Sequence, residues 1–269
     1  MSKQPDQLSA INPVAETLSA ERTRELAALP TLDEVFLEHV PTKQGHNYNP
    51  LYERHFAAHR LDVRRVLEIG VEAGTSLRFW RDYFPAAEII GFDINELCRE
   101  HEEERIRVFI GDQNKQEDLA RLPGDIDIVI DDGLHTQVSQ IETFRYLFRE
   151  KMAARGIYVI EDIVGGMKTL EFVNRMSLLH NIWPAHLPGS KWSSFDAGSD
   201  FGDTLKEYPE EEQYYILNVV GVAIYRHIAF IDKARNPEDG QAAFRLHHRD
   251  VLQRVGEVRG EWLKKHGLG

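Results

Sequence analysis

Residues 126–135 read IDIVIDDGLH, an apolar run rich in β-branched side chains that ends in two carboxylates, a glycine and a histidine. Such a run predicts a buried strand. Residues 157–162 repeat the pattern as IYVIED, and between the two runs Ile141, Phe144 and Leu147 stand at helical spacing. A strand, a helix and a strand in this order predict a parallel crossover, in which both strands end at the same edge of one sheet.

The acids that close these two strands are therefore expected to converge, because neighbouring strands lie about 4.8 Å apart. We expect Asp132, Glu161 and Asp162 to meet at one point, with His135 beside them. Three carboxylates are hard oxygen donors that suit Mg²⁺ or a similar divalent cation. On its own, His135 is also interpretable as a loop histidine that caps the following helix; the neighbouring carboxylates favour a functional role.

Composition narrows the class of protein. A net charge of −12 argues against general nucleic-acid binding, which requires clustered Lys and Arg. The single cysteine, Cys98, excludes an intrachain disulfide and fits a reducing compartment. We find no apolar run long enough for a membrane span, and residues 1–5 lack the apolar core of a signal peptide. We therefore expect a cytoplasmic protein with neither a nucleic-acid nor a membrane partner.

Residues 65–76 predict the first strand and a glycine-rich turn, which brings backbone N–H groups to a ligand. The turn has G-x-x-x-G spacing at Gly70 and Gly74, with no lysine after it. This disfavours a nicotinamide oxidoreductase and a phosphate-binding loop. Glu68 lies near the end of this strand and suits an ammonium group, and Asp93 closes the strand 88–93 and suits ribose hydroxyls. The pair favours a nucleoside that carries an amino acid.

The remaining elements complete an α/β prediction. Residues 107–113 form a strand whose polar end faces an adenine, and 219–225 and 227–232 form an antiparallel closing pair. Residues 190–212 are expected to be a loop or lid. We therefore predict a doubly wound, seven-stranded Rossmann-like sheet with an antiparallel final strand and helical N- and C-terminal extensions. The expected parts are an N-terminal helical or lid segment (1–50), the main domain (51–235) and a C-terminal helical extension (236–269).

Several motifs occur together in an order that resembles a known family. They are VLEIG at 66–70, SLRFWRDYFP at 76–85, GFDI at 91–94, GDQ at 111–113, DDGLH at 131–135 and YVIED at 158–162. In this they resemble class I S-adenosylmethionine-dependent O-methyltransferases of the macrocin/mycinamicin type. The likeness covers residues 41–165, including HNY at 46–48 and LYERHF at 51–56. Two departures are Leu134, where the family has serine, and EAG at 72–74, where it more often has an aromatic residue and two glycines.

The resemblance implies a seven-stranded methyltransferase fold and Mg²⁺-dependent methyl transfer from S-adenosylmethionine to a hydroxyl. The acceptor would be a small natural product, a sugar or polyketide intermediate. It implies that Asp132, Glu161 and Asp162 hold the metal and that His135 is the general base. The residues expected at the cofactor site are Tyr48, Glu68, Gly70, Gly74, Thr75, Ser76, Asp93, Asp112, Gln113 and Asp131. We also expect a homo-oligomer, because both terminal extensions carry apolar stripes with no evident place in a compact sheet fold.

Two alternatives from other classes stay open at this point. One is an Fe(II)-dependent hydroxylase of an antibiotic intermediate, in which the same carboxylates and histidine would hold iron as a facial triad. The sequence shows no second suitably placed histidine, which disfavours this alternative. The other is a non-catalytic binding protein, which would have no need for a base beside a metal.

Overall fold

The computed structural model describes residues 20–39, 46–164, 166–179, 205–234 and 264–265. Its seven-stranded sheet has the strand order β3-β2-β1-β4-β5-β7-β6. The strands are β1 Arg65–Ile69, β2 Glu88–Asp93, β3 Ile106–Ile110, β4 Ile126–Asp131, β5 Met152–Ile160, β6 Val219–Tyr225 and β7 Ile228–Lys233. Strands β1 to β5 pair in parallel, and β7 runs antiparallel to both β5 and β6. The predicted fold class, including its antiparallel final strand, is confirmed.

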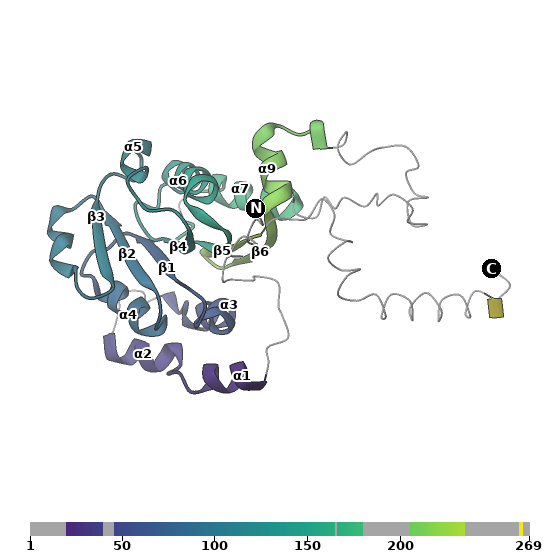
Figure 1. Ribbon diagram of the computed structural model, residues 1–269. Coiled ribbons are helices and arrows are strands. Elements are labelled where there is room, and N and C mark those ends of the chain that lie inside the picture. Colours follow the sequence, from purple (N-terminus) through teal and green to yellow (C-terminus); the bar gives the residue numbers. More distant parts are fainter. Residues whose placement is uncertain (1–19, 40–45, 165, 180–204, 235–263, 266–269) are drawn as a thin grey trace, which may run out of the picture. The chain divides into compact units, whose positions relative to one another are not determined.

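Helices cover both faces of this sheet, with α3 and α4 on one face and α6 and α7 on the other (Figure 1). The helices are α1 Ala20–Ala27, α2 Leu32–His39, α3 Asn49–Phe56, η2 Ala57–His59, α4 Thr75–Tyr83, η3 Glu96–His101, α5 Gln116–Leu119, α6 Gln137–Glu150, α7 Lys168–Leu179 and α9 Glu210–Asn218. All six residues of β4 are buried, as expected for a central strand covered on both faces. No helix in these described ranges is long and apolar enough to cross a membrane.

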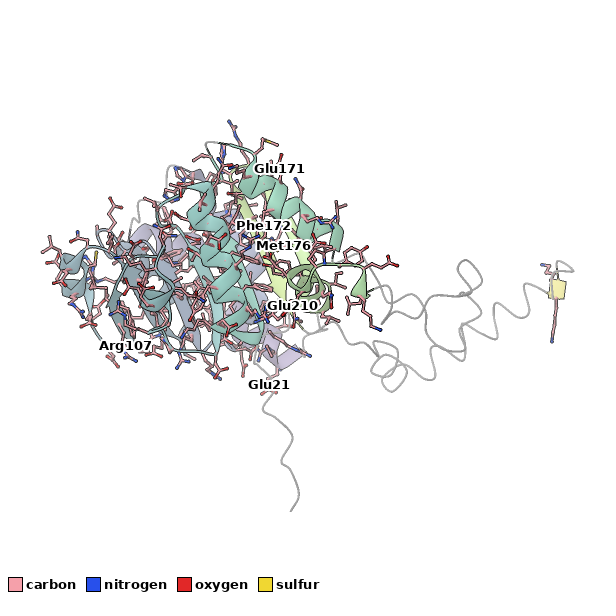
Figure 2. All side chains as sticks on the ribbon, turned by 90° about the horizontal axis from the view of Figure 1, so that it is seen from above. Glu21, Arg107, Glu171, Phe172, Met176 and Glu210 are labelled. Atoms are coloured by element: carbon pink, nitrogen blue, oxygen red, sulfur yellow. The ribbon has the colours of Figure 1, made fainter. Side chains whose placement is uncertain are left out.

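The crossover helix α6 forms as its spacing predicts. Thr136 is its N-cap, because the Thr136 Oγ1 accepts a hydrogen bond from the Ser139 N–H at 3.2 Å. The Phe144 ring packs edge-on against Phe172 of α7, which Figure 2 labels, with ring centroids 5.5 Å apart. Arg107 lies at the β3 edge of the sheet, with a side chain that is 60% exposed.

The N-terminal helix α2 belongs to the main core. Thr31 and Glu34 form a capping box, in which the Glu34 carboxylate accepts from the Thr31 N–H at 2.7 Å and Thr31 Oγ1 accepts from the Glu34 N–H at 3.3 Å. Leu32, Val35 and Phe36 are buried, and Phe36 packs edge-on against Phe79 of α4 at 6.0 Å. From the sequence, the apolar residues of the N-terminal extension are expected to have no place in the sheet fold. For the apolar residues of α2 this expectation is wrong. The C-terminal stripe lies outside the described residues.

The chain divides into two compact units, Met1–Asn181 with Asn218–Arg235, and Ile182–Leu217 with Asn236–Gly269. The sheet and the site below belong to the first unit, and the predicted boundaries at 50 and 235 stay predictions. Of the predicted loop 190–212, residues 190–204 lie outside the described residues. Residues 210–212 are helical, since they open α9, and this corrects the loop prediction there. Three glutamates in its first turn favour that helix start, because they lie near the positive end of the helix dipole.

Candidate active site

A cavity of about 630 Å³ lies at the carboxyl ends of the parallel strands. Its wall is formed by residues that follow β1, β2, β3, β4 and β5. The strand order reverses between β1 and β4, and ligands of open α/β sheets bind at such a switch point. The sheet topology therefore identifies this cavity as the first candidate for a cofactor site.

The glycine-rich turn after β1 forms one side of the cavity, and its two glycines are required by geometry. Gly70 has φ +90°, and a Cβ at this position would lie 2.2 Å from the backbone oxygen of Asp132. Gly74 has φ +68°, and a Cβ there would lie 2.4 Å from the His101 ring. The tight approach at Gly70 brings the end of β1 against the residue that follows β4. Gly74 itself does not line the cavity wall and acts by shaping the turn.

Asp93 closes β2 and binds the same turn. Its Oδ2 accepts hydrogen bonds from the backbone N–H groups of Val71 at 2.7 Å and Glu72 at 3.3 Å. Its Oδ1 accepts from the Asn95 N–H at 2.8 Å. Asp93 lines the cavity, so one carboxylate both fixes the glycine-rich turn and faces the site.

Gln113 links three elements at another side of the cavity. Its Nε2 donates to Asp131 Oδ1 at 3.4 Å and to Thr143 Oγ1 at 3.2 Å, and its Oε1 accepts from the Leu134 N–H at 2.7 Å. Asp131 is buried, and burial raises the pKa of its carboxyl group to about 7. Asp131 does not line the cavity; its contact with the site passes through the Gln113 amide.

An acidic cluster occupies the cavity wall at the ends of β4 and β5. Asp132, His135 and Asp162 each offer one ligand atom, and these atoms all lie within 4.8 Å of one another. The His135 Nε2 lies 3.8 Å from Asp132 Oδ1 and 3.8 Å from Asp162 Oδ2. Its Nδ1 is buried, with no hydrogen-bond partner among the residues that the structure describes. Two carboxylate oxygens and an imidazole nitrogen at this spacing fit a divalent cation.

Two members of this cluster have strained backbones. His135 has φ +53° and Asp162 has φ +50°, a left-handed region that is costly for residues other than glycine. Asp162 is fixed by its surroundings: the Tyr48 hydroxyl donates to its Oδ1 at 2.9 Å, and the His46 Nδ1 lies 3.0 Å from the same oxygen. Burial, together with the neighbouring carboxylates, raises the pKa of Tyr48 above its ordinary value. Tyr48 therefore stays a hydrogen-bond donor to Asp162.

Glu161 lies in the same wall but outside the cluster. It is buried, and its carboxylate accepts a hydrogen bond from the Tyr52 hydroxyl. Its backbone oxygen accepts from the Gln140 Nε2 at 2.8 Å, and the Gln140 Oε1 in turn accepts from Thr169 Oγ1 at 3.0 Å. The structure therefore brings two of the three predicted metal carboxylates together with His135. A ligand role for Glu161 stays a prediction.

Comparison with known proteins relates this arrangement to others. No protein-family model matches the sequence. Over 239 residues the chain is 34% identical to mycinamicin VI 2''-O-methyltransferase of Micromonospora griseorubida, covering 78% of this chain and 54% of that relative. Over 241 residues it is 34% identical to demethylmacrocin O-methyltransferase of Streptomyces fradiae, covering 80% and 56%. The solved structure of the methyltransferase MycE from the mycinamycin pathway, in complex with Mg and SAH, matches with a TM-score of 0.61 at 31% identity.

The chain is a relative of the mycinamicin and macrocin O-methyltransferases. The match with that MycE structure covers 78% of this chain and 56% of MycE. A second MycE structure, with Mg, SAH and mycinamycin VI, matches with a TM-score of 0.56 at 32% identity, covering 78% and 55%. The chain thus spans about half the length of the relatives it matches. The family resemblance and the class I methyltransferase fold expected from the sequence are confirmed.

In this relative of the macrocin O-methyltransferases, the predicted cofactor residues divide into two groups. Those that line the cavity are Gly70, Thr75, Ser76, Asp93, Asp112 and Gln113. Those that do not are Tyr48, Glu68, Gly74 and Asp131. Glu68 is fully buried and accepts a hydrogen bond from the Trp80 indole N–H at 3.2 Å, because side chains alternate along β1 and this one faces α4. Direct contact of Glu68 with an ammonium group stays a prediction that this placement does not support.

Several residues of the cavity wall have no role assigned from the sequence, among them Ile94, Leu134 and His46. Ile94 and Leu134 are large apolar side chains that are 71% and 55% exposed. An isolated apolar residue after a strand carries no sequence signal that it lines a cavity. His46 stands in the HNY motif of the resemblance, which was its one signal. The sequence disfavours an iron site because it shows no second suitably placed histidine, and the contact of His46 with Asp162 weakens that argument. The metal cluster found among the described residues nevertheless contains one histidine, His135.

Proposed function

We propose that this chain transfers the methyl group of S-adenosylmethionine to a hydroxyl of a glycosylated small molecule, with a divalent cation at the acidic cluster. The observation that carries the proposal is that Asp132, His135 and Asp162 lie in the wall of the same cavity as the glycine-rich turn and Asp93. A nucleoside cofactor and a cation would thus share one space. The relatives support the acceptor class, since they are named for methylating mycinamicin VI, demethylmacrocin and a rhamnosyl tetracenomycin.

The cofactor would extend along the ends of β1 to β3. The methionine carboxylate would lie near Thr75 and Ser76, whose backbone N–H groups open α4. The ribose would lie at Asp93, and the adenine between the apolar side chains of Ile94 and Leu134. In this orientation the sulfonium methyl would face the acidic cluster.

Asp132 and Asp162 would hold the cation. When bound, it would supply positive charge that acidifies an acceptor hydroxyl and orients it. Tyr48 and His46 leave Asp162 Oδ2 directed at the cluster, because both contact Oδ1. Glu161 is the further carboxylate in this wall, with Tyr52 as its hydrogen-bond donor. Hard oxygen donors favour Mg²⁺ or Mn²⁺ over softer metals.

His135 would act as the general base, because its Nε2 points at the gap between the two carboxylates. Nε2 accepts the hydroxyl proton while the oxygen attacks the methyl carbon. The new O–C bond forms as the C–S bond breaks, and SAH leaves. Positioning supplies much of the rate, since the sulfonium methyl needs only in-line placement.

His135→Ala separates this role from that of a metal ligand. If His135 is the general base, its loss lowers turnover by roughly a hundredfold or more. The Mn²⁺ affinity, measured by electron paramagnetic resonance, then stays close to that of the parent. If His135 is instead a metal ligand, its loss weakens Mn²⁺ binding as well. Parental turnover in the variant would exclude the base.

Protection against thermal unfolding tests the proposal at its first step. A ligand at 100 times its Kd adds about 2.7 kcal/mol to stability. S-adenosylmethionine and SAH should therefore raise the melting temperature, while NAD⁺ at the same concentration should not. Protection by NAD⁺, or none by S-adenosylmethionine and SAH at millimolar concentration, would refute a methyltransferase site.

A further inference from the structure

A second cavity, of about 800 Å³, lies beside the cofactor cavity. It lies between the segment 46–51 and the turn that joins β6 to β7. His46 and Asp162 line both cavities. A molecule in the second cavity would therefore reach the acidic cluster through Asp162.

The β6–β7 turn holds a fixed place relative to the cluster. The Ile163 N–H donates to the His227 backbone oxygen at 2.9 Å, directly after Asp162 in the sequence. The Tyr48 hydroxyl, which binds Asp162, also donates to that oxygen at 3.4 Å. These bonds place Arg226, at the tip of the turn, in the wall of the second cavity.

The wall of this cavity presents an exposed cation, Arg226, although the chain as a whole is strongly acidic. Arg226 is exposed and has no hydrogen bond or ion pair within the described part of the chain. Tyr225, also in the wall, accepts a hydrogen bond from Arg54 Nη1 at 3.5 Å, which brings a second guanidinium close. The carboxylate found among the described lining residues is Asp162, already bound by Tyr48 and His46.

The remaining wall suits a sugar ring. Pro50, Leu51 and Val164 offer apolar surface, and Val164 is 44% exposed. The Tyr225 ring adds an aromatic face, which packs well on the C–H face of a pyranose. An apolar wall with a few directed polar groups is typical of a small-molecule site.

We propose that the second cavity binds the acceptor, and that this acceptor is a sugar bearing an oxyanion, a carboxylate or a phosphate. Arg226 would bind the oxyanion through its planar fork of N–H donors. The hydroxyl to be methylated would then face Asp162 and the cluster. This inference rests on the proposed function and narrows its acceptor class from glycosylated molecules in general to acidic ones.

Three matched sugars test it: glucose, glucuronate and glucose 6-phosphate, which differ at C6 by a hydroxymethyl, a carboxylate and a phosphate. Ligand-observed NMR would give each Kd on the full chain with SAH present at fixed free Mg²⁺. We expect at least one acidic sugar to bind roughly ten- to hundredfold more tightly than glucose, as a charge-assisted hydrogen bond allows. The stronger of the two identifies the anion. Added salt should reduce the preference.

Arg226→Gln should abolish this preference and leave the Kd of SAH unchanged. Arg64→Gln is the matched control, because Arg64 is exposed and precedes β1 at the opposite end of the sheet. Equal affinity for all three sugars, no detectable binding of either acidic sugar, or a preference that survives Arg226→Gln would overturn the inference. Failure of SAH to bind the parent would count against methyl transfer itself, whereas intact SAH binding without a sugar preference would count against the acceptor assignment alone.

Discussion

Gly70→Ala tests the close approach that builds the site. The added Cβ would lie 2.2 Å from the backbone oxygen of Asp132 and 2.9 Å from its carbonyl carbon, at a residue with φ +90°. A left-handed backbone costs about 1–2 kcal/mol for alanine, and overpacking against a backbone that cannot rotate away costs about 1–3 kcal/mol. We therefore expect the free energy of unfolding to fall by about 2–5 kcal/mol. Asp132 should move with the strand end, so Mn²⁺ binding should weaken as well.

Urea unfolding followed by circular dichroism measures the first effect, and calorimetry with Mn²⁺ measures the second. Gly124→Ala is the matched control, because a Cβ there has no heavy atom within 4 Å and its φ is not in the left-handed range. Its stability should stay within about 0.5 kcal/mol of the parent. A Gly70→Ala protein as stable as Gly124→Ala, with parental Mn²⁺ affinity, would show that the end of β1 does not press on Asp132.

Three further changes test the cofactor contact, the metal cluster and the core. Asp93→Ala should weaken SAH binding by roughly tenfold or more in calorimetry; parental affinity would place the ribose elsewhere. Gln140→Met removes the amide that donates to the Glu161 backbone oxygen at 2.8 Å, which should loosen the adjacent Asp162. Mn²⁺ binding should weaken by roughly threefold or more, while SAH affinity stays unchanged. Unchanged Mn²⁺ affinity would contradict a role for Gln140 in holding Asp162. Burial lowers the pKa of Lys233 to about 8. Between about pH 8 and about pH 10.4 the unfolded chain therefore holds a proton on Lys233 that the folded chain has released. The free energy of unfolding should consequently rise with pH over this interval by up to about 3 kcal/mol. Lys233→Met should flatten this rise in urea unfolding, and an unchanged slope would show that Lys233 is not its source.

The parallel sheet could be predicted from the sequence because its central strands are covered on both faces. The run at 126–131 is fully buried in β4, and a strand with two buried faces needs apolar residues at nearly every position. Convergence of Asp132 and Asp162 follows from the same topology, since Asp132 comes directly after β4 and Asp162 lies two residues after the end of the neighbouring parallel strand β5. The order of elements therefore predicted the edge at which the cluster lies.

The direction of individual side chains could not be predicted in the same way. Glu161 and Asp162 are consecutive acids, and which of them faces His135 depends on the left-handed turn at Asp162, φ +50°. Glu68 points to Trp80 because of its parity on β1. The contact of His46 with Asp162 joins segments far apart in the sequence. Such contacts depend on tertiary packing, which local patterns do not encode.

A crystal structure with SAH and Mn²⁺ tests the central claim most directly, because the anomalous signal of manganese locates the ion independently of the model phases. We expect SAH density along residues 70–76, with its ribose at Asp93, and an anomalous peak in contact with the carboxylates of Asp132 and Asp162. SAH bound outside this cavity, or a manganese peak that touches neither Asp132 nor Asp162, would contradict a metal-assisted methyltransferase site at this edge of the sheet.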